Sequence, residues 1–261
     1  MTQAWTGGSF GARATCVLAP NASPMTLDGT NTWILREPGG QRSIVVDPGP
    51  LHAAHLARVA EVAGPVGLVL LTHGHLDHSE GAKEFASTVG CEVMALDPTY
   101  VYGGHGLRDG NVVSVDGLEV HVVATPGHTA DSLSFIVPAE QAVLTGDTVL
   151  GRGTTVVAHP DGALGAYLGS LRRLRDLAEA SELSVVWPGH GPVLDDALAI
   201  LDHYLAHRAE RLEQVREAVA AGAEEPMDVV RTVYADVDVR LWPAAEMSVH
   251  AQLDYLRTEA D

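Results

Sequence analysis

The chain has few positive charges. Its 261 residues include 16 basic residues against 34 acidic ones, a formal net charge of −18, and Lys83 is the one lysine. Proteins bind nucleic acids mainly through lysine and arginine on the phosphates, so a chain this acidic repels RNA and DNA at long range. A nucleic-acid function would need a local basic patch. The densest candidate is Arg172, Arg173 and Arg175 on one predicted helix, with Arg152 upstream, and a solvated helix face is the alternative explanation.

Cysteine and long apolar runs are also scarce. Cys16 and Cys91 lie far apart and form no Cys-x-x-Cys motif, so we expect both to be reduced. No apolar run reaches membrane-spanning length, and residues 1–14 lack the apolar stretch of a signal peptide. We therefore expect a cytoplasmic protein without a membrane partner. The 261 residues are enough for one large domain and a small appendage, and the 46% hydrophobic content is enough for a sizeable core.

The most informative segment is an apolar run, residues 68–71, that leads into three histidines and an aspartate. Side chains alternate along a strand, so His73 and His75 point the same way, and Asp77 and His78 follow where the pattern becomes helical. Imidazole and carboxylate together suit zinc, manganese or iron. Helix capping by Asp77 is the simpler explanation. Capping does not account for four such residues together, so the segment predicts a metal site.

Three later segments have the same organisation. In each, an apolar strand stops, a glycine lies beside a candidate ligand, and a loop follows; the candidates are His128, Asp147 and His190. Glycine permits tight turns and close approach of the backbone to a site. Loops at strand ends are where chemistry is usually placed on a rigid sheet. Each residue alone could belong to an ordinary turn, but four such strand ends in order favour one shared site.

These motifs resemble those of the metallo-β-lactamase superfamily of hydrolases, in the family's order. The resemblance implies an α+β fold, an αββα sandwich of two mixed sheets with helices outside. It also implies two divalent metal ions, with zinc expected first and manganese or iron as alternatives. In the implied ligand set His73, His75 and His128 hold the first ion, Asp77, His78 and His190 hold the second, and Asp147 bridges both. No cysteine occupies a ligand position, which departs from the antibiotic-hydrolysing members and speaks against lactam hydrolysis.

A closer resemblance is to the β-lactamase-like protein 2 group, whose animal member is an endoribonuclease. It rests on residues 23–32, 46–50, 151–156 and 188–192 and on a helical C-terminal region. The last of these is similar to the winged-helix-like tail of that group. The resemblance extends over nearly the whole chain and implies hydrolysis of single-stranded RNA. Since a fold and a subgroup do not fix a substrate, this remains one of several hypotheses.

The pattern predicts a catalytic domain over residues 1–196 and a helical, winged-helix-like domain over 197–261. Strands are expected at 32–35, 43–46, 67–71, 92–95, 112–115, 118–125, 132–137, 142–145 and 183–187. Helices are expected at 53–62, 78–88, 163–180, 197–221, 227–234 and 243–257. After Pro192 only helices are predicted. For the tail we expect a role in packing, as a lid or in a homodimer.

The expected function is that of a dinuclear metal hydrolase using a metal-bridging hydroxide. Asp77 is the expected catalytic residue, orienting the nucleophile and moving a proton, and Asp47 and Thr72 are expected to support the imidazoles. The loop 26–32, including Asn31, and Thr154 with Thr155 are expected to line the mouth of the site, where substrate would bind.

The first hypothesis is cleavage of a phosphodiester in single-stranded RNA, because the resemblance extends over nearly the whole chain. The alternatives are glyoxalase-II-like hydrolysis of thioesters or small esters, and a scaffold or regulatory protein with a vestigial site. A basic track to the metals would favour RNA. A narrow, enclosed pocket would favour a thioester or small ester. The intact ligand set argues against the scaffold.

The tail is expected not to bind duplex DNA. Residues 201–261 contain 13 acidic and six basic residues, a net charge of −7, and in its predicted last helix Arg257 is the one arginine or lysine. Readers of the major groove need positive charge and base-reading side chains. In a titration with duplex DNA we expect no tight, sequence-selective binding. Tight binding that weakens steeply with salt would contradict the prediction.

Overall fold

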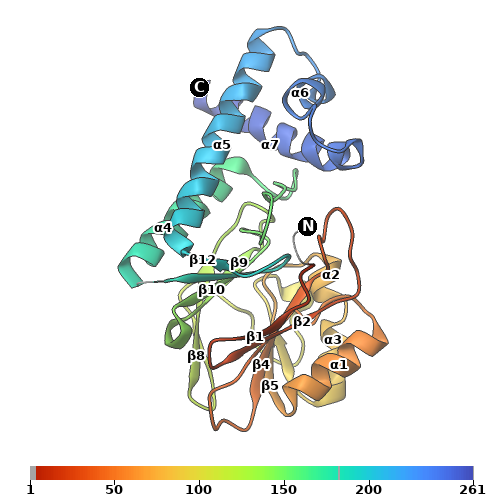
Figure 1. The fold of residues 1–261 in the computed structure, drawn as a ribbon, viewed down its shortest axis with the longest axis vertical. Helices are drawn as coiled ribbons and strands as arrows, with labels where there is room; N and C mark the ends of the chain where they lie inside the picture. The colour runs from red at the N-terminus through yellow and green to blue at the C-terminus, as the bar shows by residue number, and fades with distance from the viewer. Residues whose placement is uncertain (1–3, 182, 261) are drawn as a thin grey trace.

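The structure, a computed structural model, describes residues 4–181 and 183–260. Two six-stranded sheets lie face to face, with strand orders β1-β2-β3-β4-β5-β6 and β12-β11-β10-β9-β8-β7 (Figure 1). Both sheets are mixed. In the first, β4, β5 and β6 run parallel and the remaining pairs are antiparallel. In the second, only β10 and β11 run parallel to each other. This is the predicted α+β sandwich.

The elements follow the predicted order closely. The strands are β1 (Gly8–Phe10), β2 (Ala14–Leu18), β3 (Asn31–Leu35), β4 (Ser43–Val46), β5 (Val66–Leu70), β6 (Glu92–Met94), β7 (Val112–Val115), β8 (Leu118–Ala124), β9 (Leu133–Val137), β10 (Ala142–Gly146), β11 (Val185–Pro188) and β12 (Leu194–Asp195). The helices are α1 (Ala53–Ala63), α2 (Leu76–Ser79), α3 (Ala82–Val89), α4 (Leu164–Ser181), α5 (Ala197–Ala220), α6 (Pro226–Val233) and α7 (Trp242–Ala260). Short 3₁₀ turns lie at Pro98–Tyr100, Pro138–Glu140 and Val239–Leu241.

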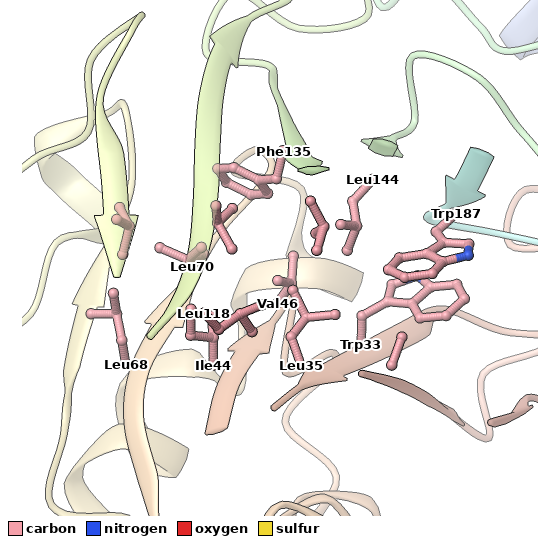
Figure 2. Close-up of a cluster of buried hydrophobic side chains, with 14 of the residues drawn as sticks. Trp33, Leu35, Ile44, Val46, Leu68, Leu70, Leu118, Phe135, Leu144 and Trp187 are labelled. Atoms are coloured by element: carbon pink, nitrogen blue, oxygen red, sulfur yellow. The ribbon is translucent and has the colours of Figure 1, made fainter. Parts of the chain in front are cut away.

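The main core lies between the two sheets. Alternate residues of β3, β4 and β5 point inward and meet those of β8, β9 and β10, as Figure 2 shows. At one end of this core Trp33 of β3 stacks on Trp187 of β11, with ring centroids 5.2 Å apart. The Trp33 indole also donates a hydrogen bond to Pro188 O (3.1 Å). The contact therefore fixes the end of β11, just before the loop that carries His190.

The outer faces of the sheets are covered by helices. Helices α1 and α3 pack on the first sheet, and α4 with the first half of α5 packs on the second. The second half of α5 packs with α6 and α7 around Val230 and Val249, forming a small helical unit beyond the sheets (Figure 1). Helix α5 is thus continuous between the sandwich and this unit, and the boundary at residue 197 stays a prediction. Within the described residues, each helix is too short or too polar to cross a lipid bilayer.

Three strands and one helix break escaped the sequence prediction. Strands β1 and β2 lie in a glycine-rich segment, and β12 has two residues, too few to show an alternating pattern, so the expectation of helices only after Pro192 was wrong. The helix expected at 78–88 is two helices, α2 and α3, separated at Gly81. The Gly81 N–H donates to Gly49 O (2.9 Å), and a Cβ there would lie 3.0 Å from the same oxygen.

The tryptophan stack makes a prediction for stability. Replacing Trp33, which is 2% exposed, by alanine removes a large buried side chain and leaves a cavity, so the free energy of unfolding should fall by about 3–5 kcal/mol. Urea unfolding of the metal-loaded protein measures it. Val112→Ala, at a residue 55% exposed, is the control and should change stability by less than about 0.5 kcal/mol. Equal effects of the two changes would mean that the stack does not stabilise the sandwich.

Candidate metal centre

The ends of four strands meet at one edge of the sandwich. His73 and His75 follow β5, His128 follows β8, Asp147 follows β10 and His190 follows β11. Two backbone hydrogen bonds join the sheets here, from Leu133 N to Thr72 O (2.7 Å) and from Asn31 N to Gly189 O (2.8 Å). Because β10 and β11 run parallel, the loops after them leave the sheet on the same side. The sheets therefore bring residues far apart in the sequence to one place.

Six of the seven predicted ligands form two adjoining groups. One group is His73, His75 and His128, and the other is Asp77, His78 and His190. In the first, His75 Nδ1 lies 3.0 Å from both His73 Nε2 and His128 Nε2. In the second, His190 Nε2 lies 3.3 Å from His78 Nε2 and 3.2 Å from Asp77 Oδ2.

Asp147 lies between the two groups. Its Oδ2 is 3.3 Å from His190 Nε2 and 3.8 Å from His128 Nε2, and its Oδ1 is 3.4 Å from His78 Nε2. The buried Oδ1 has no hydrogen-bond donor among the described residues. One carboxylate thus faces both sets of imidazoles, which is the arrangement expected of a bridging ligand.

This donor set fits metal ions. A tetrahedral zinc ion about 2.0–2.1 Å from each nitrogen leaves its ligands about 3.3 Å apart. The separations of 3.0–3.3 Å between imidazole nitrogens are close to that value. Four of the imidazoles, those of His73, His78, His128 and His190, are at most 5% exposed. Unprotonated nitrogens packed this closely repel one another unless a cation or proton lies between them.

Asp47 organises two of the imidazoles. Its Oδ2 accepts from His78 Nδ1 (2.8 Å) and from the Thr72 hydroxyl (2.6 Å), and its Oδ1 accepts from Thr72 N (2.8 Å). Since the Thr72 hydroxyl donates to Asp47, its oxygen is free to accept from His73 Nδ1, 3.0 Å away. In the neutral imidazoles, this leaves the Nε2 atoms of His73 and His78 unprotonated and directed at the site. Asp47 and Thr72 thus make the expected contacts with the imidazoles.

Backbone carbonyls orient two further imidazoles. His128 Nδ1 donates to Val156 O (2.6 Å) and His190 Nδ1 donates to Gly29 O (3.2 Å). Asp77 is held from another side, because its Oδ2 accepts from the Thr30 hydroxyl (2.9 Å). The loop before β3 thus contacts the second group directly.

Glycine at position 189 allows this close packing. A Cβ there would lie 2.5 Å from Asp147 Oδ1 and 2.8 Å from His78 Cε1. Any larger residue would push both side chains out of the cluster. The sequence predicted that a glycine beside a candidate ligand lets the backbone approach the site closely, and Gly189 does so here.

The two groups differ in electrostatics. Burial by itself lowers the pKa of His190, but Asp147 and Asp77 outweigh it and raise that pKa to about 9. The pKa of His78 is raised well above its ordinary value by Asp77, Asp147 and Asp47, against the effect of burial. Burial dominates at His73 and His128, whose pKa values are lowered. The second group therefore attracts positive charge most strongly, as cations or as protons.

A cavity of about 320 Å³ opens on the cluster. His128 and Asp147 form its floor. Its walls come from the loop before β3, the loop after β10, and helices α5 and α7 with the segment between α6 and α7. Thr154 and Thr155 line it, as do Met25 and Leu27. The helical tail is therefore one wall of the cavity over the candidate metal centre.

Other predicted substrate residues lie elsewhere. Asn31 is fully buried and accepts from the Trp5 indole, while its amide donates to Pro188 O (2.9 Å) and Gly191 O (2.8 Å). All its polar atoms are used inside the protein, so it fixes the His190 loop rather than contacting substrate. This corrects its assignment as a substrate residue.

The three clustered arginines are not part of the cavity wall. Arg173 pairs with Asp109 (2.9 Å), and Arg175 pairs with Asp202 (2.6 Å) and Glu179 (3.1 Å). Arg172 is exposed, and none of the three lines the cavity over the metal cluster. They lie on the outer layer of the sandwich, with two of their charges paired, so the cavity gives no support to the expectation that they hold substrate, which stays a prediction for RNA.

Sequence reasoning missed the contribution of the tail to the site. Arg208 and Arg211 of α5, together with Tyr234, line the cavity. A signal was present: Leu201, Tyr204, Arg208 and Leu212 follow one another at helical spacing, so an arginine occupies the apolar stripe of α5. A charge in that stripe marks a buried or functional position.

An αββα sandwich with a two-part histidine and aspartate cluster at its edge defines a class, the metal-dependent hydrolases. The chain matches the Metallo-beta-lactamase superfamily model over residues 25–190 and the Beta-lactamase associated winged helix domain over residues 226–260. It is 32% identical to the Beta-lactamase-like protein 2 homolog of Drosophila melanogaster, over 93% of this chain and 87% of that one. The chain belongs to the metallo-β-lactamase superfamily.

Two further similarities complete the comparison. The chain is 34% identical to an atrochrysone carboxyl ACP thioesterase of Aspergillus fumigatus, over 78% of this chain and 64% of that one. The crystal structure of a Beta-lactamase domain protein from Burkholderia ambifaria superposes with a TM-score of 0.82 at 22% identity, over 99% and 90% of the two chains. This second likeness shows the fold alone.

The role of Asp47 can be tested by Asp47→Asn. Asparagine tolerates the positive φ of 50° at this position and keeps the shape, but it removes the charge that orients His78 and the Thr72 hydroxyl. We expect metal affinity, measured by competition with a chelator, to fall about 10–100-fold while the fold is retained. Asp176→Asn, at an exposed carboxylate of α4, is the control. Unchanged affinity in Asp47→Asn would show that the network does not support metal binding.

Proposed function

We propose that this protein hydrolyses a thioester or small ester. The observation that carries the proposal is the cavity of about 320 Å³ over the metal cluster, walled largely by apolar side chains such as Leu150, Leu241 and Ala245. A pocket of this kind fits an acyl chain or another small organic group. Single-stranded RNA instead needs an extended cationic groove and several aromatic platforms for its bases. The arginines that line this small cavity, Arg152, Arg208 and Arg211, are few, and Tyr234 is the one aromatic residue beside them among the described lining residues apart from the histidines.

The distribution of charge supports the same choice. The chain carries a net charge of −18, and two of the three clustered arginines are paired with carboxylates far from the cavity. The basic track expected of an RNA-cleaving enzyme is therefore not formed by those residues. Cleavage of RNA stays an alternative prediction that the same experiment tests.

We assign the site residues two roles, metal binding and proton transfer. The two histidine groups and Asp147 would hold two divalent ions, with zinc proposed first. Such ions, when bound, acidify water to give a nucleophile and polarise the carbonyl under attack. Asp147 lines the cavity and its side chain is 11% exposed, whereas Asp77 is not among the lining residues and its side chain is 27% exposed, so Asp77 is the cluster's carboxylate with more access to water. We assign it the orientation of the water and acceptance of its proton.

The relatives' names are consistent with this assignment. One relative is named as a thioesterase acting on an acyl carrier protein, and it shares 34% of its aligned residues with this chain. That name describes the relative. For this chain it supports the thioester class, not the particular acyl group or carrier.

A metal-loaded activity screen tests the proposal. Zinc-, manganese- and iron-loaded protein is offered hexanoyl-N-acetylcysteamine, the matching oxygen ester, a phosphodiester reporter and single-stranded RNA. We expect the acyl substrates to be hydrolysed and Asp147→Ala to lower kcat/KM by roughly a thousandfold or more. Asp176→Ala, an exposed carboxylate on α4, should retain full activity.

Metal-dependent cleavage of RNA without acyl hydrolysis would overturn the proposal. If RNA is cleaved, joint replacement of Arg172, Arg173 and Arg175 by glutamine shows whether their surface holds it. A raised KM for RNA and a weaker salt dependence would place the RNA on that surface. Unchanged kinetics would place it elsewhere.

A further inference from the structure

Arg208 is a buried charge without a carboxylate partner. The residue is 3% exposed, and no ion pair to it is found among residues 4–181 and 183–260. A guanidinium stays protonated in proteins, so the charge persists inside the fold. Burying an unpaired charge is costly, and proteins place such charges where a partner or ligand compensates them.

Only part of the Arg208 side chain is used internally. One terminal nitrogen donates to Thr155 O, and the guanidinium lies 4.9 Å from the centre of the Tyr167 ring. The Nε atom is buried and has no acceptor among the described residues. A guanidinium has five N–H donors, more than its contacts with Thr155 and Tyr167 use. Arg208 is also among the residues that line the cavity over the metal cluster.

Arg208 is close to the cluster through one intervening residue. Thr155, whose carbonyl it contacts, also places its hydroxyl 3.3 Å from His128 Nδ1. Tyr167, against which the guanidinium packs, donates its hydroxyl to Thr148 O (2.7 Å), the residue after Asp147. Arg208 and the cluster residues His128 and Asp147 therefore line the same cavity and are joined by short chains of contacts.

A second arginine adds to the positive charge. Arg211 lies one turn further along α5 and lines the same cavity. Its guanidinium carbon lies 4.8 Å from the centre of the Tyr234 ring, and one of its terminal nitrogens donates to Val233 O (2.5 Å). It too has no carboxylate partner within the described chain. The pKa of the neighbouring His207 is lowered by burial and then by these two arginines. The one acidic residue among those lining the cavity is Asp147, which belongs to the metal cluster.

We propose that Arg208, assisted by Arg211, binds an anionic group of the substrate, a carboxylate or a phosphate, while the bond to be hydrolysed lies at the metal cluster. The proposal rests on the hydrolase function above and names its substrate class, a small acyl compound that carries negative charge away from the scissile bond. A guanidinium binds carboxylate and phosphate oxygens through paired N–H donors, and the contact strengthens where water is excluded. In a chain of net charge −18, this cavity is the place that attracts an anion.

The wild-type enzyme gives the first test. Zinc-loaded protein is assayed with hexanoyl-N-acetylcysteamine and with adipoyl-N-acetylcysteamine, which has the same chain length and a terminal carboxylate. A second pair, hexanoyl-pantetheine and hexanoyl-phosphopantetheine, places the anion on the thiol side as phosphate. One charged member should be preferred by about 30-fold in kcat/KM, mainly through KM, and that pair identifies the source of the anion.

Variants assign the preference to the arginines. Arg208→Gln and Arg211→Gln should raise KM for the preferred charged substrate by a larger factor than for its neutral counterpart, and Arg208→Lys should recover part of the preference. A merely structural role would alter both substrates equally. Arg216→Gln is the matched control, because Arg216 lies on the same helix, pairs with Glu213 and does not line the cavity. If Arg208→Gln fails to fold, Arg211→Gln and the comparison of charged and neutral substrates in the wild-type enzyme still show whether the cavity binds an anionic group.

Measuring the affinity for substrate analogues tests the anion site independently of the proposed hydrolysis. Calorimetric titration of the zinc-loaded protein uses the non-hydrolysable thioether analogues of the four substrates. Tighter binding of a charged analogue, lost in Arg208→Gln, supports the anion site even if no thioester is cleaved. Equal binding and equal turnover of charged and neutral members in both pairs would overturn it, whether or not the enzyme is a thioesterase.

Discussion

The Asp47 carboxylate accepts hydrogen bonds from Thr72 N, from the Thr72 hydroxyl and from His78 Nδ1. Through these contacts it sets the orientation of His78 directly and of His73 through Thr72, so both metal-binding groups depend on it. The residue adopts a φ of 50°, which is rarely populated by residues other than glycine. A conformation of this kind persists where surrounding contacts determine it, and here those contacts belong to the candidate active site.

The sandwich provides the rigid frame for this network. Trp33 and Trp187 stack across the sheets, and Trp33 also holds Pro188 O, two residues before His190. Asn31 ties the same loop to β3. The side chains that hold the loop are thus part of the hydrophobic core or buried beside it. This explains how ligands on separate loops can be placed within a few ångströms of one another without relying on the metal alone.

The helical tail forms one wall of the cavity over the candidate metal centre. Helix α5 begins against the second sheet and ends in the small helical unit, and Arg208 and Arg211 of this helix line the cavity. The net charge of the chain is −18, whereas these two side chains are positive. On our proposal, a small anionic acyl compound would be repelled by the surface but stabilised in the cavity, which would favour a compact ligand over a long polyanion.

The sequence by itself determined the order of the elements, and it indicated the candidate metal ligands and their contacts with Asp47 and Thr72, because strand alternation and strand-end histidines are local patterns. It also suggested the superfamily through those residues. Local patterns could not show that the Asn31 amide donates its hydrogen bonds to Pro188 O and Gly191 O. They also could not show that Arg173 and Arg175 are paired with carboxylates. Only the tertiary structure brought Arg208 to the cavity, since contacts between residues far apart in sequence depend on how the layers pack.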